Sequence, residues 1–120
     1  MKFRFLGCPS DLPKEDGIRK LSGLRGAAIS KAAERLELYE KFTFSQLKQS
    51  GDIEKIKGDN PDKVHELRMR FPEGRFRHFF IISDGDNALI LHIATKKKQK
   101  IDTDIDLAKQ RAKKLRTIIK

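Results

Sequence analysis

The chain has 120 residues, 38% of them apolar and 37% charged, so a modest core must support a highly charged surface. A net charge of +10, from 27 Lys and Arg against 17 Asp and Glu, disfavours an acidic calcium-binding domain and favours a polyanionic partner, nucleic acid before a membrane surface. A single cysteine excludes an intramolecular disulfide, and three scattered histidines argue against a metal site. No segment has the roughly 20 apolar residues of a transmembrane helix.

The N-terminal region predicts a short strand and then a weak helix. Phe3 and Phe5 alternate with basic residues, which is the period-two pattern of a strand. Met1–Leu6 lacks the apolar core of a signal peptide, so we expect a cytoplasmic protein. Ile18 and Leu21 have the spacing of one helix face, although two nearby glycines weaken this prediction.

A stronger helix is predicted next in the chain. Its apolar stripe recurs at i, i+3, i+4, i+7 and i+10, on Ile29, Ala32, Ala33, Leu36 and Tyr39. Thr43 or Ser45 then favours the start of a short helix that ends at Gly51. Residues 51–63 are polar and predict a connector whose only anchors are two isoleucines, Ile53 and Ile56.

The pattern changes to strands in the second half of the chain. Residues 64–71 alternate apolar and polar side chains, which predicts a half-buried strand, and residues 72–74 predict a hairpin turn. Residues 75–83 predict the next strand, and a turn at 84–87 leads into residues 88–94. That last segment is nearly all apolar and predicts a central strand.

A C-terminal helix completes the prediction. Thr103 and Asp106 have the spacing of a helix-capping pair, and an apolar stripe follows on Ile105, Ala108, Ala112, Leu115 and Ile119. We therefore expect one α+β domain over residues 1–120, in which N-terminal helices pack on a twisted antiparallel sheet that a C-terminal helix closes.

Most of the positive charge lies in the second half. Residues 1–63 hold 13 basic and 10 acidic side chains, whereas residues 64–120 hold 14 and 7. By strand parity Arg68 and Arg70 share one face, as do Arg75 and Arg77, so the hairpin can bring four guanidinium groups to one phosphate-binding patch. The alternative is a solvated polar face with local ion pairs to neighbouring glutamates.

A lysine-rich run follows the predicted central strand and offers further phosphate contacts at one end of the sheet. Its members are Lys96, Lys97, Lys98 and Lys100. The aromatic side chains of the preceding strand, Phe76, Phe79 and Phe80, could stack on single-stranded bases, but core packing is the stronger reading.

The three histidines differ in what their positions predict. His92 interrupts an apolar strand, where a satisfied core histidine is the common outcome, yet it lies four residues before the lysine run and can open onto the same patch. His78 follows Arg77 directly and should face the opposite side of its strand. His65 shares the face of the apolar residues on its strand and is expected to be structural.

Three segments together resemble the RelE/HigB-like toxin superfamily, most closely its phage-derived HigB-type branch. They are Val64–Arg68, Arg75–Phe80 and Leu91–Lys97. The resemblance implies helices on a twisted antiparallel sheet and a ribosome-dependent mRNA endonuclease of a toxin–antitoxin pair. It implies no metal and no cofactor: the ribose 2′-oxygen attacks the adjacent phosphate, leaving a 2′,3′-cyclic phosphate and a 5′-hydroxyl.

The resemblance also assigns roles to residues. His92 is implied in proton transfer, Arg77 in transition-state stabilisation, and Arg68 and Lys97 complete the catalytic set. The residues implied in RNA binding are Arg70, Arg75, Lys96, Lys98 and Lys100. The implied partners are mRNA on the ribosome and a helix-turn-helix antitoxin that buries the basic patch or displaces the C-terminal helix.

Two features depart from the family pattern, and two other functions remain open. The C-terminal tyrosine of several family members has no counterpart, since Tyr39 is the only tyrosine, and Ile93-Ala94 replaces the usual Gly-Phe. The alternatives are a nonenzymatic RNA-binding or regulatory domain derived from a toxin, and a ParE-like toxin that targets gyrase.

Overall fold

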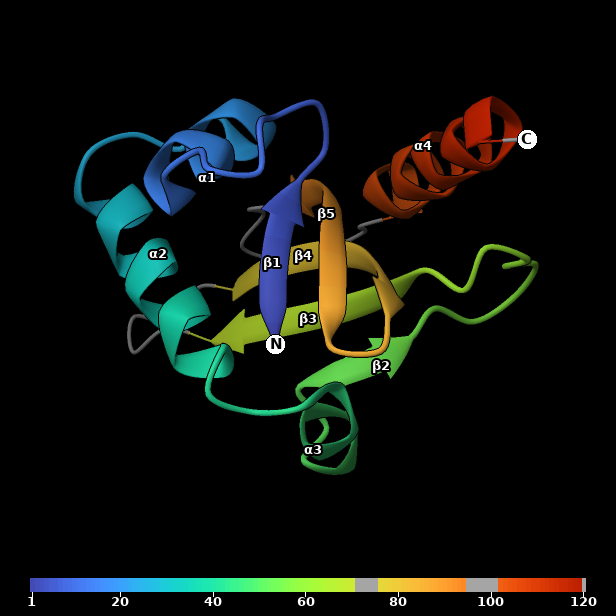
Figure 1. The fold of residues 1–120 in the computed structure, drawn as a ribbon, viewed down its shortest axis with the longest axis horizontal. Helices are drawn as coiled ribbons and strands as arrows, with labels where there is room; N and C mark the ends of the chain where they lie inside the picture. The colour runs from blue at the N-terminus through green and yellow to red at the C-terminus, as the bar shows by residue number, and fades with distance from the viewer. Residues whose placement is uncertain (71–75, 95–101, 120) are drawn as a thin grey trace.

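A computed structural model describes residues 1–70, 76–94 and 102–119. Within these residues, four helices and five strands occur in the order β1 (Lys2–Phe5), α1 (Lys14–Ser22), α2 (Ala27–Tyr39), α3 (Phe44–Gln49), β2 (Ile53–Lys55), β3 (His65–Arg70), β4 (Phe76–Asp84), β5 (Asn87–Ala94) and α4 (Asp102–Ile119). The predicted α+β class, with helices on a sheet and a closing C-terminal helix, is confirmed (Figure 1).

The five strands form one sheet in the order β1-β5-β4-β3-β2. The pairs β3–β4 and β4–β5 are antiparallel, as predicted, and β2–β3 is antiparallel as well, whereas β1 pairs parallel to β5. No hairpin joins β1 to β5, so no tight turn imposes an antiparallel direction on this pair. The predicted connector at 51–63 also needs correction, because its Ile53–Lys55 segment pairs with β3 as strand β2.

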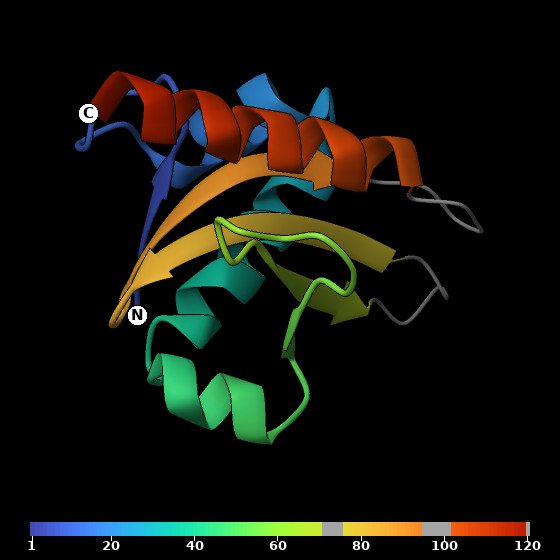
Figure 2. The same ribbon diagram turned by 90° about the vertical axis from the view of Figure 1, so that its right-hand side faces the viewer.

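Each face of the sheet carries its own hydrophobic cluster. On one face α1, α2 and α3 cover the sheet, with Ile18, Leu36 and Leu47 packed against Leu67 and Phe79. On the opposite face α4 lies across the strands (Figure 2), and the buried residues are Ile56, Val64, Phe80, Leu91, Ala94, Ala108 and Ala112. We call this second surface the α4 face, and the surface under α1, α2 and α3 the helix-covered face.

The ends of the helices follow from local sequence signals. Thr43 caps α3: its hydroxyl oxygen accepts from the Gln46 amide at 3.1 Å, and the Gln46 side chain accepts from the Thr43 amide at 2.9 Å. The expected cap at Thr103 is wrong, because α4 begins at Asp102 and Thr103 lies inside its first turn. The hairpin turn predicted at 72–74 lies outside the described residues.

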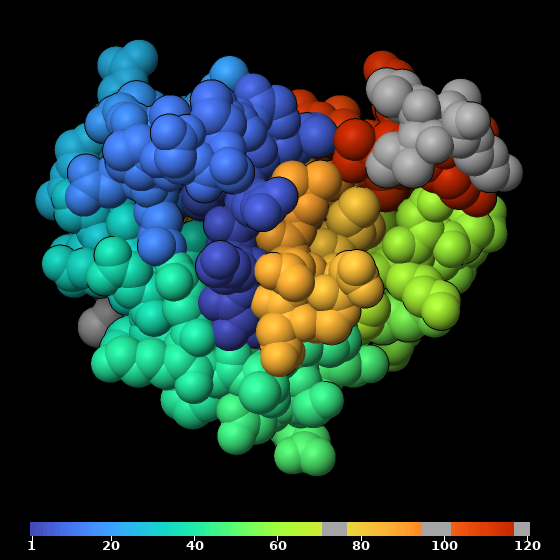
Figure 3. Space-filling view, viewed as in Figure 1, coloured from blue at the N-terminus to red at the C-terminus, as the bar shows by residue number. Residues whose placement is uncertain are grey.

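The connector between β2 and β3 is held in place by specific side-chain hydrogen bonds and an ion pair. Asn60 fastens its base, since the side-chain nitrogen donates to the Ile56 and Val64 carbonyls at 3.0 and 2.9 Å and the side-chain oxygen accepts from the Val64 amide. Asp62 pairs with Arg116 of α4 at 3.2 Å, and Figure 3 shows the connector surface directly against α4. This loop therefore helps hold α4 over the sheet.

Within the described ranges, no helix combines the length and apolar character needed to cross a membrane.

Candidate functional site

The basic residues of β3 reach solvent on the α4 face. Arg68 is about half exposed and pairs with Glu66 at 3.6 Å and with Glu54 at 4.0 Å. Arg70 is exposed two residues further on. The predicted shared face of these two arginines is confirmed, and the local ion pairs of the alternative interpretation exist as well for Arg68.

The predicted convergence of all four arginines is wrong. The register places Arg68 opposite His78 and Met69 opposite Arg77, so Arg77 lies on the helix-covered face with only 5% of its surface exposed. A shift of one residue between paired strands moves every side chain to the other face, and sequence parity within each strand does not fix that phase. Arg75 lies outside the described residues.

His78 faces away from Arg77, as predicted, but it is His78 and not Arg77 that shares the α4 face with Arg68, the reverse of the expected arrangement. Its Nδ1 donates a hydrogen bond to Glu66 Oε1 on the neighbouring strand. Burial raises the pKa of the Glu66 carboxyl, but the hydrogen bond from His78 and the charges of His78 and Arg68 outweigh that effect and leave this pKa below its usual value. Glu66 is therefore an ionised carboxylate that holds His78 and Arg68 together.

His92 is held by a second carboxylate, from α4. Its Nε2 lies 2.7 Å from Asp104 Oδ1, and both side chains are about 14% exposed. A carboxylate only accepts hydrogen bonds, so Nε2 donates to Asp104, and the tautomer with a single ring proton has its lone pair on Nδ1. That Nδ1 is buried and has no hydrogen-bond partner in the described part of the chain. A nitrogen so arranged can accept a proton once a hydroxyl reaches it.

The two imidazoles lie on neighbouring strands of the same face. Phe80 pairs with His92 and stacks on it, with ring centroids 6.2 Å apart and planes 12° apart. His78 pairs with Ala94, so His78 and His92 are diagonal neighbours, a relation that places Cα atoms about 7–8 Å apart in a regular sheet. Two titratable rings thus flank Phe80, each fixed by its own carboxylate.

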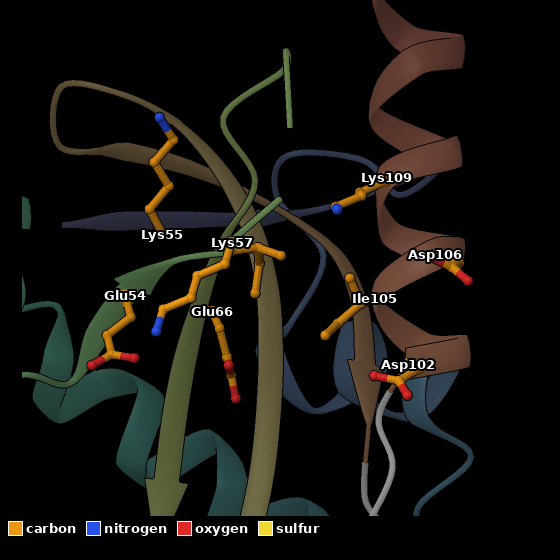
Figure 4. A pocket seen from close by; sticks show the side chains of 9 residues that line it. Glu54, Lys55, Lys57, Glu66, Asp102, Ile105, Asp106 and Lys109 are labelled. Atoms are coloured by element: carbon orange, nitrogen blue, oxygen red, sulfur yellow. The ribbon is translucent and has the colours of Figure 1, made fainter. Parts of the chain in front are cut away.

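A pocket of about 450 Å³ opens next to this arrangement, between β2, β3 and the start of α4. Its lining combines carboxylates with ammonium groups, among them Glu54, Glu66, Asp102, Lys57 and Lys109. Figure 4 shows Lys109 reaching from α4 toward the strands, while Asp106 points away from them. The lysines donate hydrogen bonds and the carboxylates accept them, which suits a planar polar group that carries both donors and acceptors. A phosphate suits the pocket less well, because the carboxylates repel its negative charge.

The remaining sequence-predicted residues separate into two groups. Lys96, Lys97, Lys98 and Lys100 lie outside the described residues. Phe79 and Phe80 are fully buried on opposite faces, which confirms core packing over base stacking for both. His65 is structural as expected: its Nδ1 donates to the Lys63 carbonyl at 2.8 Å and its ring meets Phe44 edge-on.

Sequence reasoning missed Asp104 as the partner of His92. The two residues are twelve positions apart on different elements, and no spacing rule for helices or strands connects them. The sequence predicts Glu66 only as an ion-pair partner of arginine. Its place two residues before Arg68 puts both side chains on one face of β3, and this was the available signal that Glu66 could also bind a side chain of the adjacent strand.

Comparison with known proteins gives one match. The family model described as Phage derived protein Gp49-like (DUF891) matches residues 16–113. Neither the curated proteins nor the solved structures include a significant match. The matched range contains both carboxylate–imidazole pairs and the seven buried apolar residues of the α4 face.

Proposed function

We propose that this chain, which belongs to the phage-derived Gp49-like family, is the toxin of a toxin–antitoxin pair and cleaves mRNA without a metal ion. The family comprises toxin–antitoxin toxins related to RelE and HigB. The observation that carries the proposal is the His92–Asp104 pair at 2.7 Å, on the same sheet face as His78, Glu66 and Arg68.

The proposed reaction begins with attack of a ribose 2′-oxygen on the adjacent phosphorus. His92 Nδ1 accepts the proton of the 2′-hydroxyl, and Asp104 stabilises the imidazolium that forms. The bond from phosphorus to the 5′-oxygen breaks, and that oxygen takes a proton from His78. The products are a 2′,3′-cyclic phosphate and a 5′-hydroxyl end, with no change in oxidation state.

Cations on the same face stabilise the charge on the phosphate. Arg68, which pairs with Glu66 on the face of both histidines, is assigned this task, and Lys97 is assigned it from its family position. Arg70, Arg75, Lys96, Lys98 and Lys100 are assigned to the RNA backbone, where guanidinium and ammonium groups bind phosphates. The opposite orientation of Arg77 removes it from the reacting phosphate in this proposal.

The burial of His92 Nδ1 supports a requirement for the ribosome. In the free chain no hydroxyl reaches this atom, so cleavage needs a bound state in which its cover has moved. A ribosome that presents mRNA to the α4 face supplies the binding energy for that change. Free RNA, which binds fewer groups of the protein at once, is then a poor substrate.

The test compares the wild type with His92→Ala and Asp104→Asn for growth arrest and for mRNA cleavage on purified ribosomes. Both variants should lose cleavage by about 100-fold or more, because the proton acceptor or its orientation is gone. His65→Gln is the matched control, since it changes a histidine on the helix-covered face. We expect full cleavage by toxin that was treated with EDTA and dialysed before its addition to the ribosomes, and rescue of growth by a co-expressed helix-turn-helix antitoxin.

The ends of the RNA decide between the proposal and its alternatives. A 2′,3′-cyclic phosphate in the wild type that disappears in both variants supports the proposed chemistry. RNA binding without cleavage by any variant would establish a nonenzymatic RNA-binding domain, which the covered Nδ1 would also fit. Growth arrest with gyrase-dependent DNA breaks and intact mRNA would establish a ParE-like toxin.

A further inference from the structure

The side chains of β5 do not alternate regularly between the two faces of the sheet. Ala88 and Ile90 belong to the cluster on the helix-covered face, so strict alternation would place residue 92 there as well. His92 instead faces α4 and bonds to Asp104. An irregularity between residues 90 and 92 therefore changes which face of the sheet the following side chains occupy.

A β-bulge at Leu91 causes the reversal. Ile81 pairs with Ile90 and Phe80 pairs with His92, so the β4–β5 pairing skips Leu91. In a bulge two consecutive residues oppose a single residue of the partner strand. Leu91 and His92 accordingly both lie on the α4 face, Leu91 in its apolar cluster and His92 beside Asp104.

Helix α4 contacts the bulge directly. Arg111 Nη1 donates a hydrogen bond of 2.7 Å to the carbonyl oxygen of Leu91, the residue that the pairing skips. Arg111 follows Asp104 by seven residues, two helical turns, so both side chains project from the same side of α4. One helix face thus holds the bulge through Arg111 and the adjacent imidazole through Asp104.

We propose that Arg111 is a positioning residue that maintains the bulge at Leu91 and thereby keeps His92 on the α4 face with its Nε2 on Asp104. Its effect on RNA cleavage rests on the proposed function, whereas its effect on His92 does not. The other role open to an arginine here is a direct phosphate contact. The engagement of Arg111 with a backbone carbonyl in a half-buried site favours positioning.

The experiment substitutes Arg111→Met and Arg111→Lys and uses Arg116→Met as the matched control. Arg116→Met removes the same charge from the same helix and also breaks a tether, the Asp62 pair, but does not touch the bulge. Long-range ¹H–¹⁵N correlations report the tautomer of His92, and NOEs between the His92 and Phe80 rings report its placement. Cleavage is measured on ribosomes with the same samples.

Arg111→Met should abolish the ring NOEs, move the His92 nitrogen shifts toward a mixture of tautomers and lower cleavage about 100-fold, the effect of a misplacement near 1 Å. Arg111→Lys, whose single shorter donor holds the Leu91 carbonyl less firmly, should recover only part of both signals, and Arg116→Met should leave both unchanged. If Arg111→Met is unfolded by circular dichroism, the Lys variant decides through a partial change of the same His92 signals.

Two results would overturn the proposal. One is a folded Arg111→Met protein, or a Lys variant in its place, with wild-type His92 signals. The other is loss of cleavage with unchanged His92 signals, which would make Arg111 a phosphate ligand. A wild type that cleaves no RNA, combined with displaced His92 signals in Arg111→Met, would refute the proposed function and leave the positioning role established.

Discussion

Gly17 is predicted to be irreplaceable in α1, although alanine is the better helix former. A Cβ atom at this position would lie 2.4 Å from both Cγ and Cδ2 of the Phe5 ring and 2.8 Å from Cδ1. Phe5 is the last residue of β1 and has 5% of its surface exposed. Gly17→Ala therefore sets helix propensity against the packing of α1 on β1.

The magnitude follows from these two opposed effects. Ordinary carbon contacts begin near 3.4 Å, so the ring would have to retreat by about 1 Å into a filled core. Overpacking of this kind costs about 1–3 kcal/mol. A displaced aromatic ring belongs at the upper end, and replacing a helical glycine by alanine returns roughly 1 kcal/mol. We expect a net loss of about 2 kcal/mol, or roughly 8 °C in Tm at about 4 °C per kcal/mol.

The assay is urea and thermal unfolding of the wild type, Gly17→Ala, Phe5→Ala and the double variant. Phe5→Ala removes Cγ, Cδ1 and Cδ2, the ring atoms that the new Cβ meets, so the penalty of Gly17→Ala should largely vanish in that background. Ser30→Ala, at an exposed position of α2, controls for helix propensity alone. A higher Tm for Gly17→Ala in the presence of Phe5 would refute the packing argument.

Three further predictions concern stability. Burial lowers the pKa of His65, so the unfolded chain binds protons more readily; the free energy of unfolding should fall as the pH drops below 6.5, and His65→Gln should flatten that dependence in thermal melts. Thr43→Ala should cost about 1 kcal/mol in urea unfolding through loss of the α3 cap, whereas Ser45→Ala should cost far less. Ala108→Leu should cost about 1–3 kcal/mol by overpacking the contact of α4 with the sheet, and Gln110→Leu on the exposed side should not; equal unfolding midpoints for the two would contradict the packing described.

Local signals in the sequence were enough to predict most elements of the fold. The stripe through Ile29 and Leu36 predicted α2 and its buried face, and the start of α3 was predicted at Thr43 or Ser45, of which Thr43 is the cap. These signals work because a helix face or a cap depends on residues only a few positions apart. Strand β2 escaped prediction because three residues, Ile53–Lys55, are too few to show alternation.

The candidate site was harder to predict because it depends on relations between elements. Parity assigned the faces within β3 and β4 correctly, but the phase between the two strands decides where Arg77 points, and parity does not contain that phase. In β5 nearly every residue is apolar, so no alternation is available to reveal the bulge at Leu91. Because the sequence does not reveal the bulge, it does not predict that His92 meets Asp104.

The pairing of the first strand with the last has a consequence for synthesis of the protein. Lys2 and Phe5 find their partners at Asn87 and Ile90, so the sheet cannot close until β5 has been translated. Contacts this distant in sequence slow folding, and a growing chain holds its early segments unpaired until then. We expect nascent chains that end before β5 to remain protease-sensitive, and the His92–Asp104 pair to assemble only after α4 has been translated.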